Sequence, residues 1–292
     1  MRALPRLGKR SSTGGSCSRT TSPADTPSGR ARLGHCRRAR GTFSRVRDGI
    51  TLDREGGVAT ITLDAPDRRN ALTVEMAREL VSVCEEVDAD PSVGAVVVGA
   101  TGAYFCAGAD RRTLAEAGRD PAAPAAYAAL GDIYRSFQRV GELEPPTVAA
   151  IRGGAVGAGM NLALATDLRI VARDARLASG FVPVGLHPGG GHAALLGRLG
   201  GREATSALTL FGETIDGDRA AAVGLAWEAV DEPDVDGRAR ALAVVAGADP
   251  ELARRSARSL RTQLGPPALP WPAALELERA SQMWSMRRKA QA

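Results

Sequence analysis

Two glycine-rich segments, 101–110 (TGAYFCAGAD) and 153–161 (GGAVGAGMN), most constrain what this chain can fold into. Each follows a short apolar run, Ala95–Val98 or Thr147–Ile151, that is typical of a buried strand, and each precedes a stretch that can be helical. A turn of small residues after a strand leaves backbone N–H groups free to point at a ligand. Two such turns that meet at one oxygen form an oxyanion hole, which stabilises charge as it develops on a carbonyl. The pair therefore predicts an α/β fold with chemistry at an acyl thioester, through an enolate or by addition.

Two simpler interpretations compete with this one. Each turn can be only a tight connection in which glycine supplies a positive φ. The second turn contains Gly157-Ala158-Gly159, but the third glycine of a G-x-G-x-x-G dinucleotide fingerprint falls on Leu162. Neither turn is followed by Gly-Lys-Ser/Thr, which excludes a Walker-type phosphate loop. The ordered pair favours the oxyanion hole.

The net charge of +5 is unevenly distributed along the 292 residues. Residues 1–47 contain twelve Lys and Arg against Asp25 alone, a net +11, so residues 48–292 carry −6. An acidic body makes nucleic-acid binding an unlikely function for it. The basic tail, rich in Arg, Ser, Gly and Pro, is predicted to be disordered.

The tail also bears on localisation. It lacks the apolar stretch of a secretory signal, and the chain has no apolar run of the ~18–20 residues that span a bilayer. Residues 1–44 fit either an organellar transit peptide or sequence translated upstream of the true start, and the second interpretation predicts a cytoplasmic protein. The four cysteines have neither disulfide nor metal-site spacing, so a reducing compartment and no metal are expected.

Hydrophobic periodicity gives a coarse order of helices and strands. Thr73 is placed to cap a helix that Asp90-Pro91 ends, and residues 127–137 have a second amphipathic pattern. Leu168–Ala172 is a predicted strand, and from about Gly201 the pattern is mainly helical. Residues 111–125, with Arg, Ala, Gly and Pro, are predicted to form a mobile loop.

Seven segments resemble motifs of the enoyl-CoA hydratase/isomerase (crotonase) family, in the family's order, over about residues 57–258. They are Val58–Asp64, Pro66 with Asn70–Thr73, Phe105–Asp110 (similar to F-x-A-G-A-D), Ile151–Asp167, Pro188–Gly191 (similar to PG-x-G), Phe211–Asp216 and Ala220–Leu225. The resemblance implies a crotonase-like spiral of ββα units in residues 48–200 and a helical trimerisation region in 201–292. It also implies a homotrimer or hexamer and an acyl-CoA substrate. Coenzyme A then enters as part of the substrate, and no separate cofactor is expected.

The resemblance also assigns the site by position. It implies that the backbone N–H groups of Ala109 and Ala158 form the oxyanion hole, with Ala158 in ordinary helical conformation. It also implies that the residues around the hole contact the acyl-CoA: Ala107, Gly108, Asp110, Gly157, Phe181 and Gly189. Groups near the CoA phosphates fall on Arg68, Arg69, Arg111 and Arg112, although each can equally be a solvated surface arginine.

The sequence departs from the family where a hydratase has two glutamates. Those positions hold Asn161 and Phe181, and neither side chain can take a proton from water near neutral pH. His187 and His192 flank the Pro188–Gly191 turn and are candidates for proton transfer, or are packed without a catalytic role. Cys106 lies in the first turn, where a nucleophile is less expected than a small apolar residue.

Two further carboxylates occur in the motifs, and both have structural interpretations. Asp110 is expected to cap a turn, and Asp167 to orient a link between helix and strand. Relatives usually have a further helix after the segment resembling Glu276–Met286. We therefore expect part of the CoA cover to be missing or to come from a neighbouring subunit.

Three functions remain open from the sequence. The first is an enzyme that stabilises a thioester enolate, nominally hydrating 2-enoyl-CoA, with isomerisation, decarboxylation or thioester hydrolysis as alternatives. The second is an acyl-CoA-binding protein without catalysis. The third, nucleic-acid binding through the tail, is the least favoured.

Overall fold

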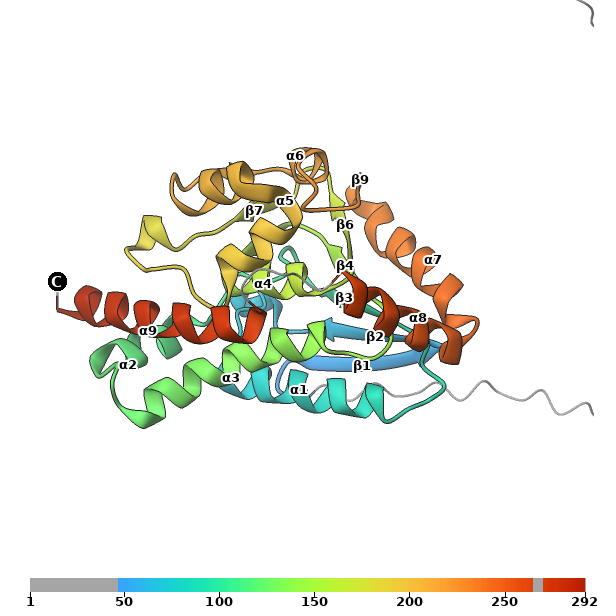
Figure 1. Ribbon diagram of the computed structural model, residues 1–292, viewed down its shortest axis with the longest axis horizontal. Helices are drawn as coiled ribbons and strands as arrows, with labels where there is room; N and C mark the ends of the chain where they lie inside the picture. The colour runs from blue at the N-terminus through green and yellow to red at the C-terminus, as the bar shows by residue number, and fades with distance from the viewer. Residues whose placement is uncertain (1–46, 265–269, 292) are drawn as a thin grey trace, which may run out of the picture. The chain divides into compact units, whose positions relative to one another are not determined.

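The computed structural model describes residues 47–264 and 270–291, and a six-stranded sheet forms their centre (Figure 1). In spatial order its strands are β1 (Ile50–Glu55), β2 (Val58–Leu63), β3 (Ala95–Ala100), β4 (Thr147–Ile151), β6 (Leu168–Ala172) and β9 (Glu228–Val230). β1 and β2 form an antiparallel hairpin, and every other neighbouring pair is parallel. β3 and β4 are buried along their whole length, as expected of parallel strands covered by helices.

A smaller sheet carries the second glycine-rich turn. It consists of β5 (Gly154–Val156), β7 (Arg176–Ala178) and β8 (Thr214–Ile215), with β5 and β7 parallel and β7 and β8 antiparallel. The first turn joins its edge through a bridge between Cys106 and Ala155. Both glycine-rich turns therefore belong to one local structure.

The amphipathic helices follow the predicted periodicity. α1 (Val74–Asp88) begins where Thr73 accepts a hydrogen bond from the backbone N–H of Met76, at 3.2 Å. Its apolar stripe faces α3 (Pro124–Gly141), which runs beside it (Figure 1). α4 (Ala158–Ala165) starts directly after the second turn and is buried in all but its last residue.

The prediction of a mobile loop at 111–125 is wrong, because α2 (Arg111–Arg119) occupies most of it. The carboxylate of Asp110 accepts hydrogen bonds from the N–H groups of Arg112 and Thr113, at 2.9 and 3.2 Å. This cap supplies an acceptor for two of the N–H groups that the first turn of a helix leaves without an intrahelical partner. α2 also packs against the C-terminal helix α9 (Trp271–Ala290), a tertiary contact that the sequence pattern does not reveal.

The C-terminal third is largely helical, as predicted. It contains α5 (His192–Thr209), α6 (Gly217–Ala222), α7 (Val235–Gly247), α8 (Pro250–Gln263) and α9. The expected boundary at residue 200 falls at a break inside α5, where Gly201 has a φ of 71°. α7 packs on β3, β4 and β6, which joins this region to the sheet in one compact unit.

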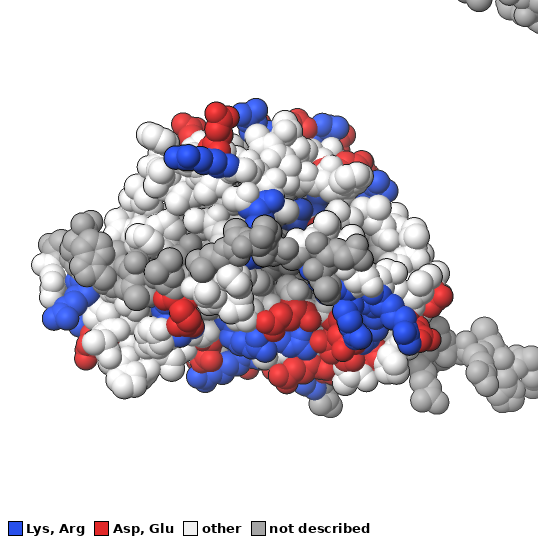
Figure 2. All heavy atoms as spheres, in the orientation of Figure 1, with Lys and Arg blue, Asp and Glu red and all other residues white. Residues whose placement is uncertain are grey.

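Charged side chains of both signs adjoin one another on the face seen in Figure 2. Arg54 pairs with Glu86 and Arg78 with Asp132, at 3.0 and 2.7 Å. In both pairs a carboxylate offsets the positive charge of the arginine. The predicted disordered tail lies outside the described residues, apart from Arg47.

Candidate active site

The first glycine-rich turn, the second turn and the end of β7 lie side by side. The N–H of Cys106 donates to the carbonyl of Gly154 and the N–H of Val156 donates to the carbonyl of Cys106, at 3.1 and 3.0 Å. On the other side β5 pairs with β7 in the register Val156 to Ala178, and the N–H of Gly157 donates to the carbonyl of Ala178 at 3.2 Å. Three segments far apart in sequence thus end at one edge.

The two turns converge where the oxyanion hole is expected. Gly108 has a φ of 100°, and a Cβ at this position would lie 2.8 Å from the carbonyl oxygen of Val156 and 3.6 Å from the backbone nitrogen of Ala158. Only glycine fits this close approach. The next residue along the first turn is Ala109, so its N–H and that of Ala158 come from adjoining pieces of backbone.

Both N–H groups are available to a ligand. Ala158 is the first residue of α4, after Gly157 with a φ of 55°, so its N–H has no acceptor within the helix. Among the described residues, the hydrogen bonds give neither Ala109 nor Ala158 a backbone acceptor. The positive end of α4 adds a favourable field for a developing negative charge.

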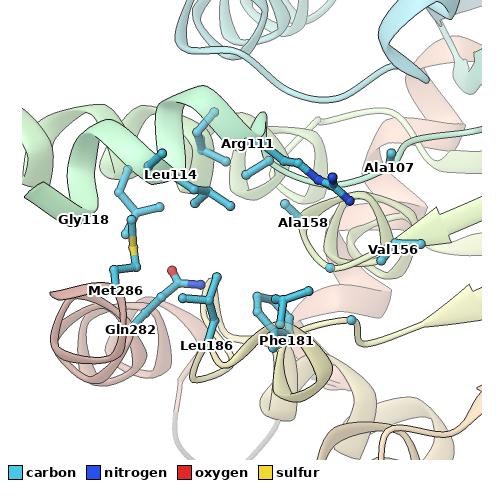
Figure 3. Close-up of a pocket in the computed structure, with 18 of the residues that line it drawn as sticks. Ala107, Arg111, Leu114, Gly118, Val156, Ala158, Phe181, Leu186, Gln282 and Met286 are labelled. Carbon is cyan, nitrogen blue, oxygen red and sulfur yellow. The ribbon is translucent and has the colours of Figure 1, made fainter. Parts of the chain in front are cut away.

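A largely apolar pocket of about 600 Å³ opens onto these turns (Figure 3). Figure 3 shows Leu114, Phe181, Leu186 and Met286 directed toward the hollow from different parts of the chain. Its lining comes from the two turns, α2, α3, the segment 179–186 and α9. α9 contributes Gln282, Met286 and Ala290, so the segment 276–286 and the residues just after it cover one side of the pocket.

The structure brings together some of the predicted residues and separates others. The pocket lining includes Ala107, Gly108, Ala109, Gly157, Ala158 and Phe181. It does not include Arg68, Arg69, Asp110, Arg112, Asn161, His187, Gly189 and His192. The site therefore has a preformed backbone and an apolar acyl cavity, with most of the predicted cations outside it.

The arginines differ in their surroundings. Arg111 lines the pocket, and its guanidinium points toward Ala158 (Figure 3). The guanidinium of Arg69 lies 5.2 Å from the centre of the Tyr104 ring, and Arg68 donates to the carbonyl of Ala71 at 3.1 Å. Arg111 is therefore the arginine best placed to meet a bound anion.

Asn161 and His192 are buried together behind the pocket. The Nδ1 atom of His192 lies 2.7 Å from the Oδ1 atom of Asn161, whose Nδ2 donates to the carbonyl of Gly189 at 3.0 Å. The Nε2 atom of His192 lies 2.6 Å from the Oγ atom of Ser179. The imidazole ring and the Phe181 ring pack in an edge-on arrangement, with 5.1 Å between the ring centres. Burial lowers the pKa of His192 to about 3, which keeps the imidazole neutral.

Ser179 is the site residue that sequence reasoning missed. It follows β7 directly and lines the pocket, two residues before Phe181. The sequence placed Ser179 two residues before Phe181, a predicted site residue, but nothing local marked the serine itself. Its hydrogen-bond partner, His192, is 13 positions away in the sequence, and only the fold shows that the two side chains meet.

Three other candidates have structural surroundings. Cys106 is fully buried, and burial raises the pKa of its thiol to about 12, so the thiol stays protonated. Asp167 accepts hydrogen bonds from the N–H and hydroxyl of Thr147, at 2.8 and 3.0 Å, and so links α4 to β4. His187 is exposed, with Nδ1 2.7 Å from the carbonyl oxygen of Pro188.

Asn70 holds the first turn in place, and its loss is expected to destabilise the fold. Its side chain accepts from the N–H of Ala65 and donates to the carbonyls of Thr101 and Tyr104, at 2.7, 2.9 and 2.7 Å, from a backbone φ of 54°. Asn70→Ala leaves buried groups unsatisfied and puts alanine in a left-handed conformation. We expect the free energy of unfolding in urea to fall by about 3 kcal/mol.

Asn70→Gly is the matched control, because glycine removes the side chain without the backbone strain. It is expected to lose less stability than Asn70→Ala. Equal stability of Asn70→Ala and the wild type would show that these hydrogen bonds do not hold the turn.

No helix that the structure describes has the length and apolar character to cross a membrane. In the described ranges, no group of three or more His, Cys, Asp or Glu side chains is arranged to hold a metal ion.

Known proteins agree with the motifs and the geometry. Residues 53–286 match the sequence model of the enoyl-CoA hydratase/isomerase family. The chain is 40% identical over 222 residues to the probable enoyl-CoA hydratase EchA14 of Mycobacterium tuberculosis, covering 76% of this chain and 85% of that protein. It is 34% identical over 194 residues to the 1,2-epoxyphenylacetyl-CoA isomerase of Escherichia coli, covering 65% of this chain and 72% of that protein.

The fold is similar to that of an enoyl-CoA hydratase/isomerase from Xanthobacter autotrophicus Py2, with a TM-score of 0.75 and 30% identity over 83% of this chain and 91% of that one. The resemblance seen in the motifs is thus confirmed, and this chain belongs to the enoyl-CoA hydratase/isomerase family.

Proposed function

We propose that this protein is an enzyme that binds an acyl-CoA thioester and polarises its carbonyl between the N–H groups of Ala109 and Ala158. The observation that carries the proposal is the convergence of two turns, with Ala109 and Ala158 both lining one pocket. Donors fixed in this way stabilise an enolate or a tetrahedral oxyanion more than they stabilise the neutral carbonyl.

The pocket fits an apolar acyl group. Its walls are mainly aliphatic and aromatic, and its volume of about 600 Å³ is in the range of small-molecule sites. Arg111, at the edge near Ala158, is the proposed contact for the CoA phosphates, with Arg68, Arg69 and Arg112 as more distant candidates.

The reaction is not expected to be hydration by paired glutamates. Asn161 occupies one of the two positions and is hydrogen-bonded to His192 and Gly189, while Phe181 occupies the other. The two relatives named above are a hydratase and an isomerase by name, so family membership alone does not select the reaction. We expect any hydration of 2-enoyl-CoA to be slow, because a positioned base contributes about 10²–10⁴-fold.

Self-association as a trimer or hexamer is part of the proposal. Large apolar side chains are exposed in the C-terminal third, including Leu210, Phe211 and Trp227. Exposed apolar groups of this kind favour a protein interface. Their burial between subunits is expected to appear as a trimeric or larger mass in light scattering.

The first experiment combines calorimetry with the ultraviolet absorbance of a short 2-enoyl-CoA. We expect the thioester to bind, free CoA to bind more weakly, and the enoyl absorbance to fall slowly or stay constant. Rapid loss of the absorbance would contradict the expectation of slow hydration. Equal affinity for free CoA and acyl-CoA would contradict the proposed use of the pocket for the acyl group.

A further inference from the structure

We propose that Ser179, with His192 and Asn161, acts as a nucleophile that takes the acyl group from the CoA thioester and passes it to water. This inference rests on the proposed function for its substrate. It assigns thioester hydrolysis through an acyl-serine as the reaction of this site.

The hydrogen bonds define which nitrogen of His192 carries the proton. The Nδ2 group of Asn161 donates to the carbonyl of Gly189, so the Oδ1 atom of Asn161 faces Nδ1 of His192 as an acceptor. An acceptor at 2.7 Å places the proton on Nδ1. Nε2 is then the acceptor for the hydroxyl of Ser179, at 2.6 Å. Nucleophile, base and orienting group are thus in the order that activates a serine.

The register of the small sheet places this serine beside the oxyanion donors. β5 and β7 pair from Gly154 with Arg176 to Val156 with Ala178. The residues that follow the two strands are Gly157 and Ser179, and the N–H of Gly157 donates to the carbonyl of Ala178 at 3.2 Å. Ala158 follows Gly157, so the serine lies next to the backbone that ends in the proposed oxyanion hole.

The surroundings of Gly157 also place Ser179 and Phe181 beside the second turn. A Cβ at this glycine would lie 3.5 Å from the carbonyl oxygen of Ser179 and 3.7 Å from the ring of Phe181. Ser179 is 2% exposed and nevertheless lines the pocket. A nucleophile here meets a substrate in the pocket but little bulk water.

The environment of His192 sets the strength of the base. Ser179 and Asn161 lie at hydrogen-bonding distance from the two ring nitrogens and Phe181 packs against the ring, and none of these three side chains carries a charge. Asn161 orients the imidazole but supplies no negative charge to stabilise an imidazolium. The reaction is therefore expected to be slow compared with that of an enzyme that has an aspartate in this position.

The acylation step needs no reactant besides the thioester and the side chains named above. The Oγ atom of Ser179 forms a bond to the thioester carbon while its proton moves to Nε2 of His192. The N–H groups of Ala109 and Ala158 hold the oxyanion. The C–S bond then breaks, and the proton moves from Nε2 to the sulfur, which leaves as the CoA thiol.

Deacylation uses one water molecule. Its oxygen bonds to the ester carbon as one proton moves to Nε2 of His192, and the same two N–H groups hold the oxyanion. The C–O bond to Ser179 breaks, and the proton returns to Oγ. The net reaction converts thioester and water into carboxylic acid and CoA thiol, with no change of oxidation state.

The test uses the full chain and octanoyl-CoA, with free CoA separated from the thioester by chromatography. The wild type is expected to release CoA, and mass spectrometry after an acid quench is expected to find an octanoyl ester on the peptide that contains Ser179. Ser179→Ala is expected to lose at least 100-fold in CoA release and all of the adduct. Ser136→Ala is the matched control, since Ser136 is also buried but donates to the carbonyl of Ile133 within α3, at 2.7 Å.

The role of Asn161 as a positioning residue is tested by the pH–rate profile. Asn161→Asp puts a negative charge beside Nδ1 and raises the pKa of His192. The acidic limb of CoA release is then expected to move to higher pH, with a faster plateau. An unmoved limb in the folded variant would overturn this role.

The outcomes separate this inference from the proposed function. Octanoyl-CoA that binds in calorimetry but yields neither free CoA nor adduct would overturn the acyl-serine and leave the pocket assignment intact. CoA release that persists in Ser179→Ala would also overturn the acyl-serine and leave the pocket assignment intact. Failure of the wild type to bind octanoyl-CoA would overturn the proposed function instead.

Discussion

Ala158→Pro is expected to fold and to lose at least about 100-fold in its rate of acyl-thioester consumption. Proline has no N–H, so the substitution removes one of two donors from the proposed oxyanion hole. Loss of one such donor costs about 10²–10³-fold in known enzymes. The helix should tolerate the change, because Ala158 is the first residue of α4 and proline is favoured at that position.

Ala158→Gly provides the matched comparison. It keeps the N–H and removes only the methyl group, so its rate is expected to stay within a few-fold of the wild type. Circular dichroism and thermal unfolding check that both variants keep the fold. Wild-type turnover in a folded Ala158→Pro protein would remove this N–H from the site.

The elements that the sequence predicted are those whose burial follows a simple period. Thr147–Ile151 was predicted as a buried strand from its apolar residues, and β4 has those bounds. α1 was predicted from Thr73 and the apolar stripe behind it, and the structure confirms the cap. In both cases local chemistry and burial point to the same conformation.

The region 111–125 shows where such reasoning fails. The Arg, Ala, Gly and Pro content of this segment favoured a mobile loop, but Arg111–Arg119 forms a helix. α2 depends on the cap from Asp110 and on contact with α9, whose residues lie about 160 positions further along the chain. Tertiary contact decides the conformation, and a local pattern does not contain it.

The candidate site divides in the same way. The family resemblance assigned Ala109 and Ala158 by their positions in two turns, because backbone N–H groups at a strand end need no particular side chain. Ser179 and His192 are 13 positions apart, and Asn161 and His192 are 31 apart. Their meeting depends on the pairing of β5 with β7 and on the start of α5, so the residue types were visible in the sequence but the network was not.

Acid is expected to destabilise this protein steeply through His192. Burial lowers its pKa to about 3 in the folded state, against 6.5 for an ordinary histidine. Between these values the unfolded chain binds a proton that the folded chain excludes. The contribution is therefore fully present above about pH 6.5, and the free energy of unfolding falls as the pH drops below it, by about 1.4 kcal/mol per pH unit.

Urea unfolding of the wild type and His192→Gln at pH 7, 6, 5 and 4 measures this effect. Glutamine keeps hydrogen-bonding capacity but does not titrate, so His192→Gln should be less stable at pH 7 and should lose less stability toward pH 4. His187→Gln removes an exposed imidazole and serves as the control, with the slope of the wild type expected. Parallel slopes for wild type and His192→Gln would show that His192 takes up its proton in the folded protein. Burial would then not lower the pKa of His192, contrary to this prediction.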